Sequence, residues 1–388
     1  MKKCKLGDIC EVQAGGTPSR SNPEYWNGGS IPWVKISDFS GKHLFYTEEC
    51  ITESGLKNSS AKIFPSGSIL YSIFASLGEV TILDIDACTN QAIAGITVRD
   101  KSYVNRDYIY YYLKSIKNKV SEMGRGVAQN NINLSMLRGF EFNIPSLKEQ
   151  ELAVERLCKA EINIENRKTQ LELLDTLIKA RFVEMFGMPV SNSKGFEQTT
   201  LIKVLAEGRT VSYGIVQTGD DVDGGVPVFR PIDIAGGHVP TRKQLKCTLP
   251  EISNKYKRTL LKGNELLITV RGSVGETFQT TEEFEGCNVG RNIVPLLTDS
   301  TIVNQRFLQE LFANDEIKNW LRGITKGIAL QGLNMSEFQE MPVVVPPIEL
   351  QDSYVEFAHR VDKSKAVVQK ALEEAQLLFD SLMQEYFG

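Results

Sequence analysis

The side chains with the widest chemical repertoire in this sequence are its cysteines and histidines. No two cysteines have the C-x-x-C spacing of a zinc or redox site, and no histidine has a Cys or carboxylate neighbour at ligand spacing. We therefore predict no metal site, and we interpret the cysteines as free thiols in a reducing compartment. The residues are Cys4, Cys10, Cys50, Cys88, Cys158, Cys247, Cys287, His43, His238 and His359.

Catalytic motifs are equally scarce. The sequence has no G-x-x-x-x-G-K-[ST] phosphate-binding loop and no G-x-S-x-G nucleophile turn. Its glycine pairs, Gly15-Gly16, Gly224-Gly225 and Gly236-Gly237, are more typical of loop turns than of phosphate cradles. We predict that the chain has no catalytic residues of its own.

Length and charge limit the remaining classes. The 388 residues suggest two or three domains. The net charge of −4 is not that of a basic nucleic-acid binder, although the acidic excess is concentrated in residues 346–388. Any phosphate neutralisation must therefore come from local patches or from a partner. No apolar run is long enough to cross a membrane, and no apolar segment follows the basic start, so we expect a cytoplasmic protein.

A long internal repeat organises the chain. Residues 126–135 recur as residues 327–336, and residues 143–150 recur as 344–351, each pair 201 positions apart. Residues 31–38 resemble residues 226–233 at an offset of 195. A repeat of this length indicates a duplicated domain and not a solenoid of small units.

The first part of each repeat is predicted to be mixed α/β. Short apolar and β-branched runs between Gly, Pro, Asn and Ser predict strands near residues 68–74, 95–98, 266–270 and 292–297. Apolar residues at spacings of three and four predict one helix near residues 106–119 and one near residues 305–323.

The second part of each repeat is predicted to be one long helix. Residues 149–185 contain neither Pro nor Gly, and apolar residues recur every seven positions from Leu157 to Met185, with a weaker row from Ala153 to Arg181. The same rows return in the second copy at the same offset of 201. A heptad seam this long requires a helical partner, so we expect the two helices to pair antiparallel, as a rod with one domain at each end. The alternative is a duplicated helical bundle.

The architecture and several local stretches resemble the specificity subunits of type I restriction-modification enzymes. The similar stretches are residues 5–19, residues 25–34, and the run from Gly126-Val-Ala-Gln129 through Leu134 to Ile144-Pro145 and Glu149-Gln150. The second copy departs from the pattern at Leu330 and Leu350. The resemblance covers essentially the whole chain.

This resemblance implies an α+β fold in which two similar α/β target-recognition domains alternate with two long helices that form an antiparallel coiled coil, as a pseudo-twofold internal repeat. The domains would be residues 1–145 and 188–345, and the spacer helices residues 146–187 and 346–388. Each domain would read one half of a bipartite, asymmetric site in double-stranded DNA, and the coiled coil would set the spacing of the half-sites.

The resemblance also implies partners. Two methyltransferase subunits would dock on the helices, bind S-adenosylmethionine and methylate adenine, and motor-nuclease subunits are optional additions. The specificity chain itself would carry no chemistry. In agreement, the Asn-Pro-Pro-Tyr type of motif is absent, and its nearest approach, Ser21-Asn-Pro-Glu-Tyr25, lacks the second proline.

Candidate DNA contacts follow from the residue types that read base edges, which are Arg, Lys, Asn, Gln and Ser on loops or helix ends. Each has the alternative of being an ordinary solvated or turn-forming residue. We interpret Trp33 as core and not as a base-stacking residue, and Arg271 as the replacement of Ala75 or Ser76. The candidates are Thr17, Ser19, Arg20, Lys35, Asn90, Gln91, Arg125, Asn130, Tyr213, Arg230, Arg271, Ser273, Arg291, Asn292 and Lys326.

Two other functions remain open at the level of sequence. A coiled-coil adaptor that binds only proteins fits the charge, but it does not explain two large domains with different loops. A fused methyltransferase or nuclease fails on length and motifs. The sequence does not distinguish a modification system from a complete restriction system.

Overall fold

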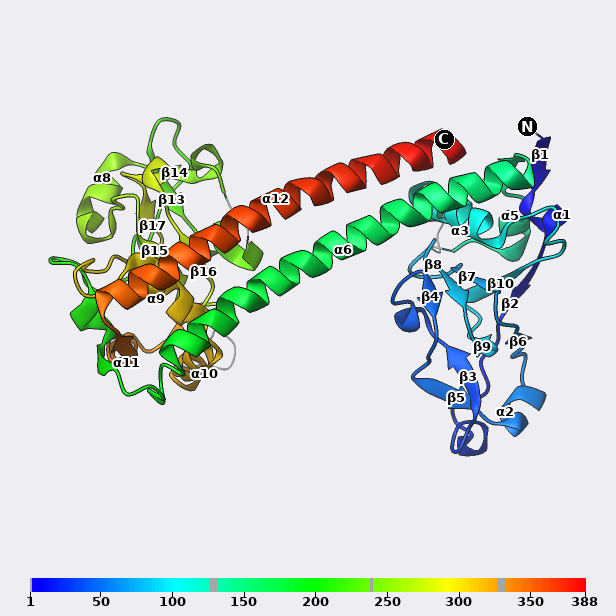
Figure 1. The fold of residues 1–388 in the computed structure, drawn as a ribbon, viewed down its shortest axis with the longest axis horizontal. Coiled ribbons are helices and arrows are strands. Elements are labelled where there is room, and N and C mark those ends of the chain that lie inside the picture. The colour runs from blue at the N-terminus through cyan, green and yellow to red at the C-terminus, as the bar shows by residue number, and fades with distance from the viewer. Residues whose placement is uncertain (1, 126–130, 238–239, 327–331) are drawn as a thin grey trace. The chain divides into compact units, whose positions relative to one another are not determined.

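The computed structural model describes residues 2–125, 131–237, 240–326 and 332–388. By its internal contacts the chain forms two compact units, one of residues 1–168 with 370–388 and the other of residues 169–369 (Figure 1). Both long helices therefore contribute to both units. Within the described residues, no helix is both long enough and apolar enough to cross a membrane.

The globular part of the first unit is built on two sheets. The larger has the strand order β2-β10-β7-β8-β4, and the smaller has the order β5-β3-β9-β6. The strands are β2 (Cys10–Ala14), β3 (Ile31–Val34), β4 (His43–Leu44), β5 (Glu49–Ile51), β6 (Ile63–Phe64), β7 (Ile69–Ser72), β8 (Val80–Leu83), β9 (Ala87–Thr89) and β10 (Ile93–Val98).

The two faces of the larger sheet pack in different cores, as the side chains that alternate along β7 show. Ile69 and Tyr71 face the core that includes helix α3 (Arg106–Ser115) and the long helices, whereas Leu70 faces a core shared with Val34 and Phe64 of the smaller sheet. Side chains alternate between faces because a strand has a period of two. Strand β1 (Lys2–Lys5) pairs antiparallel with β11 (Glu141–Ile144), immediately before the first long helix.

The second unit repeats this plan with fewer paired strands. Its sheets have the orders β16-β15-β18 and β14-β13-β17, and β12 pairs with β21 as β1 does with β11. Helix α9 (Gln305–Ala313) takes the place of α3 in its core. The strands of these two sheets and of the β12–β21 pair are β12 (Glu197–Thr200), β13 (Val226–Phe229), β14 (Lys246–Thr248), β15 (Leu266–Thr269), β16 (Thr277–Gln279), β17 (Asn288–Val289), β18 (Ile293–Leu296) and β21 (Pro342–Val345).

The helices expected near residues 106–119 and 305–323 are each two helices. Helix α3 is followed by α4 (Lys117–Arg125), and α9 is followed by α10 (Asp315–Gly323). In the second unit Asn314 has extended backbone angles and its side chain accepts the Glu316 N–H, so it ends one helix and caps the next. Periodicity alone did not reveal the break, since the apolar spacing continues through it.

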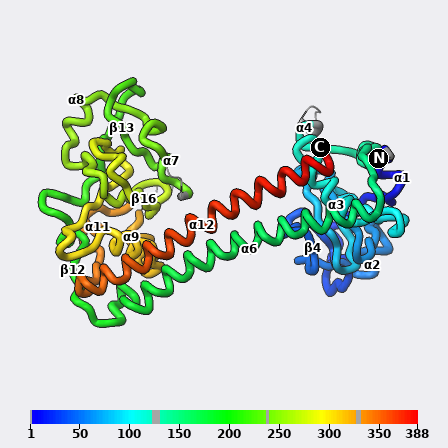
Figure 2. The backbone as a smooth tube through the Cα atoms, turned by 45° about the horizontal axis from the view of Figure 1, so that its top comes forward, coloured from blue at the N-terminus to red at the C-terminus, as the bar shows by residue number. Residues whose placement is uncertain are grey.

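The two long helices are α6 (Leu147–Phe186) and α12 (Ile348–Phe387), each of 40 residues. In the first unit the Arg156 guanidinium donates to the Tyr386 hydroxyl at 3.1 Å, and in the second Lys365 pairs with Asp175 at 2.5 Å. Partners early in one helix thus meet partners late in the other, so the helices run antiparallel, side by side in both views (Figure 1 and Figure 2).

The seam predicted from the heptads is confirmed within both units. Leu157 and Ile164 are buried in the first unit with Ala375 and Phe379, and Ile178 is buried in the second with Tyr354, Ala358 and Val361. Toward the end of α6, burial shifts to Phe182 and Phe186, which the heptad rows did not include.

An aromatic contact at the end of each long helix is repeated. Phe186, near the end of α6, packs on Phe307 of α9 with ring centroids 4.8 Å apart. Phe387 occupies the equivalent place at the end of α12 and packs on Tyr108 of α3 with centroids 4.9 Å apart. Each helix therefore ends against the globular core of a unit, and packing in that core fixes the position of the helix end.

A buried glutamine anchors the beginning of each long helix in the same way. The Gln150 amide accepts the Asn105 N–H at 2.8 Å and donates to the carbonyls of Tyr103 and Pro145. The Gln351 amide accepts the Asn304 N–H at 2.9 Å and donates to the carbonyls of Ile302 and Pro346. Both glutamines are fully buried, so each satisfies three backbone groups that water does not reach.

We expect Gln150→Met and Gln351→Met to destabilise their own units to a similar extent. The substitution keeps the side-chain volume but leaves one N–H and two carbonyls unpaired, at a cost of roughly 2–4 kcal/mol in the free energy of unfolding. Urea titration followed by circular dichroism measures it. The exposed Gln376→Met on α12 is the control, and equal stability of all three variants would contradict the anchoring role.

Candidate nucleic-acid interface

The loops after β7 and β15 share one hydrogen-bonded frame. The Ser72 hydroxyl accepts the Glu79 N–H at 2.8 Å and donates to the Ser76 carbonyl. The Thr269 hydroxyl accepts the Glu276 N–H at 3.0 Å and donates to the Ser273 carbonyl. Every partner keeps the same offset along the chain, so the two loops are matched position by position.

In this match Arg271 is the equivalent of Phe74. The prediction that Arg271 replaces Ala75 or Ser76 is therefore wrong. Phe74 forms an isolated antiparallel bridge with Asn131, and Arg271 forms the same bridge with Gly332. The next residue has a positive φ in both loops, 63° at Ala75 and 81° at Gly272. An alanine in this region costs on the order of 1 kcal/mol, so the frame must impose the turn.

Four predicted contact residues of the second unit meet in one pocket. Arg271, Arg291, Asn292 and Lys326 line a cavity of about 430 Å³. Lys326 is paired with Glu337 at 2.8 Å, whereas neither arginine has an ion-pair partner among the residues that the structure describes. Both arginines are exposed. The pocket is therefore positively charged and open to a ligand rich in acceptors.

At the positions matched to the two arginines, the first unit has the neutral side chains of Phe74 and Gln91. The Thr17 hydroxyl donates to Oε1 of Gln91, so these two candidates are in contact. Gln91 corresponds to Arg291, because the carbonyl of Asn90 accepts the Ile93 N–H as that of Gly290 accepts the Ile293 N–H. The Asn90 side chain accepts the Ala92 N–H, which gives it a turn-forming role.

Three other predicted cations already have carboxylate partners. Arg20 pairs with Glu49 and stacks on Trp26, with its guanidinium carbon 3.7 Å from the ring centroid. Lys35 pairs with Glu48 at 2.8 Å and Glu49 at 3.0 Å. Arg230, at the position matched to Lys35, pairs with Asp233 at 2.9 Å.

The pKa shifts in these pairs follow from the same contacts. The hydrogen bond from Arg20, with help from Lys35, lowers the pKa of Glu49 although partial burial opposes the shift. The hydrogen bonds to Glu48 and Glu49 raise the pKa of Lys35, and the hydrogen bond to Asp233 raises the pKa of Arg230. The charges hold one another in place, so they are less available to phosphate than the arginines of the pocket.

The remaining candidates are scattered. Ser19 is exposed and shares a hydroxyl contact of 2.9 Å with Ser21. Tyr213 is 45% exposed, and Ser273 is exposed in the loop after Arg271 but does not line the pocket. Asn130 and the side chain of Arg125 lie outside the described residues.

Trp33 is buried, as predicted, and Cys88 and Cys287 are buried as well. The Trp33 indole is 2% exposed and donates to the Gly16 carbonyl at 3.0 Å. Burial raises the pKa of Cys88 and Cys287 to about 11. Trp33 and Val228 are matched in the repeat. Cys88 pairs with Trp33 and Asn288 pairs with Val228, so strand register matches Cys88 with Asn288. Cys287 thus precedes its strand β17 and is one position out of register with Cys88.

Three exposed aromatic residues of the first unit are absent from the predicted contacts. Phe45 and Tyr46, which follow β4, are 70% and 74% exposed, and Phe74 is 50% exposed. Alignment of the repeats on Ser76-Leu-Gly78 and Ser273-Val-Gly275 would have paired Phe74 with Arg271. Two adjacent aromatic residues in a polar loop were the available signal for Phe45 and Tyr46.

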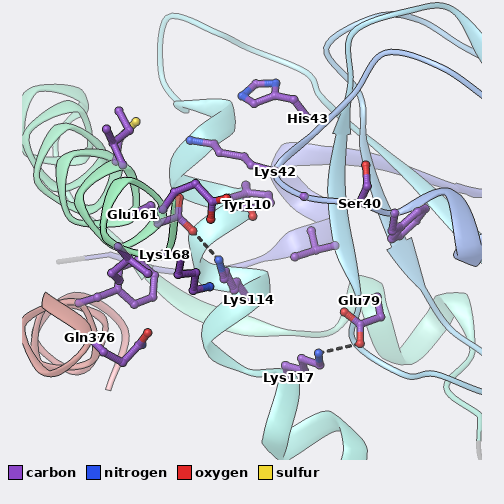
Figure 3. Close-up of a pocket in the computed structure, with 18 of the residues that line it drawn as sticks. Ser40, Lys42, His43, Glu79, Tyr110, Lys114, Lys117, Glu161, Lys168 and Gln376 are labelled. Carbon is purple, nitrogen blue, oxygen red and sulfur yellow. Dashed lines mark hydrogen bonds and ion pairs between the residues drawn. The ribbon is translucent and has the colours of Figure 1, made fainter. Parts of the chain in front are cut away.

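A second, larger groove lies in the first unit between the sheet and the long helices (Figure 3). Its volume is about 860 Å³, and its lining includes Lys42 and His43 from the sheet side, Lys168 from α6 and Gln376 from α12. Lys114 pairs with Glu161, and Lys117 pairs with Glu79 at 2.6 Å. Because these lysines are paired with carboxylates, the groove is not arranged to capture a single anion.

Within the described residues, no group of three or more His, Cys, Asp or Glu side chains is arranged to hold a metal ion.

The sequence model of one protein family, described as "Type I restriction modification DNA specificity domain", matches residues 1–175 and again residues 196–376. The chain belongs to this family. Both globular parts fall within a match, so the family's domain is present twice. The resemblance to type I specificity subunits is confirmed.

Individual relatives agree with this assignment. The chain is 27% identical over 369 residues to the type I restriction enzyme MjaIX specificity subunit of Methanocaldococcus jannaschii, which covers 88% of this chain and 82% of the relative. It is 23% identical over 328 residues to the EcoBI specificity subunit of Escherichia coli, which covers 78% of this chain and 69% of the relative.

Solved structures of the family have the same fold. The S subunit of the type I restriction-modification system from M. genitalium aligns with a TM-score of 0.56 at 15% identity, covering 100% of this chain and 96% of that one. A chain described under "complex assembly and conformational transition of the type I R-M system" aligns with a TM-score of 0.61 at 17% identity, covering 100% of this chain and 97% of its own. The α+β fold with two long helices is thus that of the specificity family.

We expect Glu49→Gln to strengthen DNA binding by the assembled complex in a salt-dependent manner. Removing this carboxylate releases Arg20 for a phosphate, so the slope of log K against log salt should steepen by up to about 0.9. Fluorescence anisotropy over a salt series measures the slope. The control is Glu155→Gln, which breaks an exposed pair with Lys159 on α6. An unchanged slope for Glu49→Gln would place Arg20 away from DNA.

Proposed function

We propose that each globular part reads one half of a bipartite, asymmetric DNA sequence. The observation that carries this proposal is the pair of matched loop frames with different side chains at their tips, Phe74 in one and Arg271 in the other. The two loops have the same backbone frame but present an aromatic side chain in one domain and a cationic side chain in the other. Two domains that read different half-sites require such a difference. The positive pocket around Arg271 and Arg291 supports DNA as the ligand.

The long helices set the distance between the half-sites in this proposal. Each spans 40 residues, or roughly 60 Å at about 1.5 Å per residue. Buried contacts fix both ends of each helix. In α6 these are the contacts of Gln150 at the start and Phe186 at the end, and in α12 those of Gln351 at the start and Phe387 at the end. A helix that is fixed at both ends keeps a constant distance between those ends, which a spacer between two half-sites requires.

The same helices dock two methyltransferase subunits. Leu177 of α6 and Leu378 of α12 are matched in the repeat, and they are 46% and 54% exposed. Leu173 and Leu377 beside them are 61% and 67% exposed. Apolar side chains that occur singly need no explanation, but an exposed leucine at the matched position of both helices favours a repeated protein contact. Two equivalent sites accept two copies of one partner.

The chemistry belongs to those partners. The methyltransferase subunits bind S-adenosylmethionine and transfer its methyl group to adenine, while this chain selects the site. Motor-nuclease subunits would join in a complete restriction system.

A methylome tests the proposed function. The chain is expressed with the adenine methyltransferase encoded beside it in a host without adenine methylation, and modified bases are mapped by long-read sequencing. We expect a two-part motif with a fixed gap, methylated once on each strand. A single unbroken motif, or no methylation with an active partner, would favour the protein-only adaptor.

We expect Leu177→Glu and Leu378→Glu each to remove one methyltransferase from the complex. A buried, unpaired carboxylate opposes docking by roughly tenfold or more, while the exposed position spares folding. Mass photometry should show the stoichiometry falling from two partners to one in each single variant and to none in the double variant. Leu249→Glu, at a leucine 44% exposed in the second globular part, is the control. Two bound partners in the double variant would contradict this docking surface.

A further inference from the structure

The cations predicted to contact DNA differ in their ion-pair partners. Arg20, Lys35 and Arg230 are held by carboxylates, which fixes their orientation and neutralises them. Arg271 and Arg291 line one pocket and have no carboxylate partner within the described residues. Because both side chains are exposed and unpaired, their guanidinium donors are available to a ligand rich in acceptors.

An unsatisfied amide lies at the same pocket. The side-chain oxygen of Asn292 is buried and has no hydrogen-bond donor among the described residues. A buried acceptor without a donor destabilises the folded chain, because it has lost its hydrogen bonds to water without replacement. The pocket therefore combines two guanidinium donors with an acceptor, and a ligand with both acceptors and donors would complete it.

The matched positions of the first unit decide which part of DNA such a pocket contacts. Phosphates are the same in every sequence, so a phosphate-gripping position would keep its cation in both copies. Here the frame is kept, but Arg271 is matched by Phe74 and Arg291 by Gln91, which are both neutral. A side chain that changes its chemistry on an unchanged frame behaves as a base reader.

We propose that Arg271 and Arg291 are the specificity-determining pair of the second domain and that its half-site presents guanine to them. The guanidinium fork donates to O6 and N7 of guanine in the major groove, which is the base edge with two adjacent acceptors. Phe74 and Gln91 have no guanidinium fork. We therefore expect no arginine–guanine contact at the matched position of the first half-site. This inference rests on the proposed function.

The first test uses the complete complex with its methyltransferase partner. Arg271→Lys and Arg291→Lys keep the positive charge but remove the bidentate fork. In the methylome, each variant should lose discrimination at one G·C position, roughly 5- to 150-fold, and all changes should lie in one half of the motif. Arg322→Gln, an exposed arginine outside the pocket, should leave the motif unchanged.

The second test replaces the guanine that the variants identify by 7-deazaguanine, which lacks the N7 acceptor. We expect the wild-type complex to bind this oligonucleotide more weakly than the natural one, and the variant that lost that position to bind both equally. Thermal melting of each variant shows whether it remains folded.

The outcomes separate the inference from the function on which it rests. No two-part motif with the wild-type chain overturns the proposed function. A two-part wild-type motif that Arg271→Lys and Arg291→Lys leave unchanged overturns the inference alone. Alanine variants that weaken binding equally for all sequences, with a salt slope reduced by about one, would make these arginines phosphate contacts and likewise overturn it.

Discussion

Each compact unit depends on covering the apolar seams of two long helices. A long helix with one apolar stripe is not stable alone in water, because most helical stability in proteins comes from packing that stripe. Leu157 of α6 and Phe379 of α12 enter the core of the first unit, and Phe182 and Tyr354 enter that of the second. Neither globular part is therefore completed by its own stretch of sequence, since each needs helical residues from the other half of the chain.

This dependence separates the parts of the molecule that are constrained from those that are free to differ. The seam, the anchoring glutamines and the aromatic helix ends occur in both copies, because losing any of them exposes a core or leaves a buried backbone group unpaired. The tips of the β7 and β15 loops have no such role. Their backbone is held by Ser72 and Thr269, so the exposed side chains can change without loss of the fold.

Electrostatics follow the same division. The chain is acidic overall, and Arg20, Lys35 and Arg230 are neutralised by neighbouring carboxylates, yet one pocket of the second unit keeps two arginines without acidic partners among the described residues. Net charge describes the average surface, whereas recognition depends on the local field, which a small cluster can set against the average. The acidic excess of residues 346–388 therefore does not exclude a DNA-binding role for the globular parts.

The duplication, the two long helices and the buried seam could be predicted from the sequence, because each is a periodic or repeated pattern along the chain. The sequence also suggested Arg271, Arg291, Asn292 and Lys326 as contacts, but only as separate polar residues on loops. Tertiary structure alone decided that these four meet in one pocket while Lys35 and Arg230 are neutralised, because ion pairs and loop contacts join residues with no fixed spacing in sequence. The match of Phe74 with Arg271 follows from a local alignment of Ser76-Leu-Gly78 with Ser273-Val-Gly275, and the hydrogen-bonded frame establishes it, because the offset of the repeat drifts along the chain.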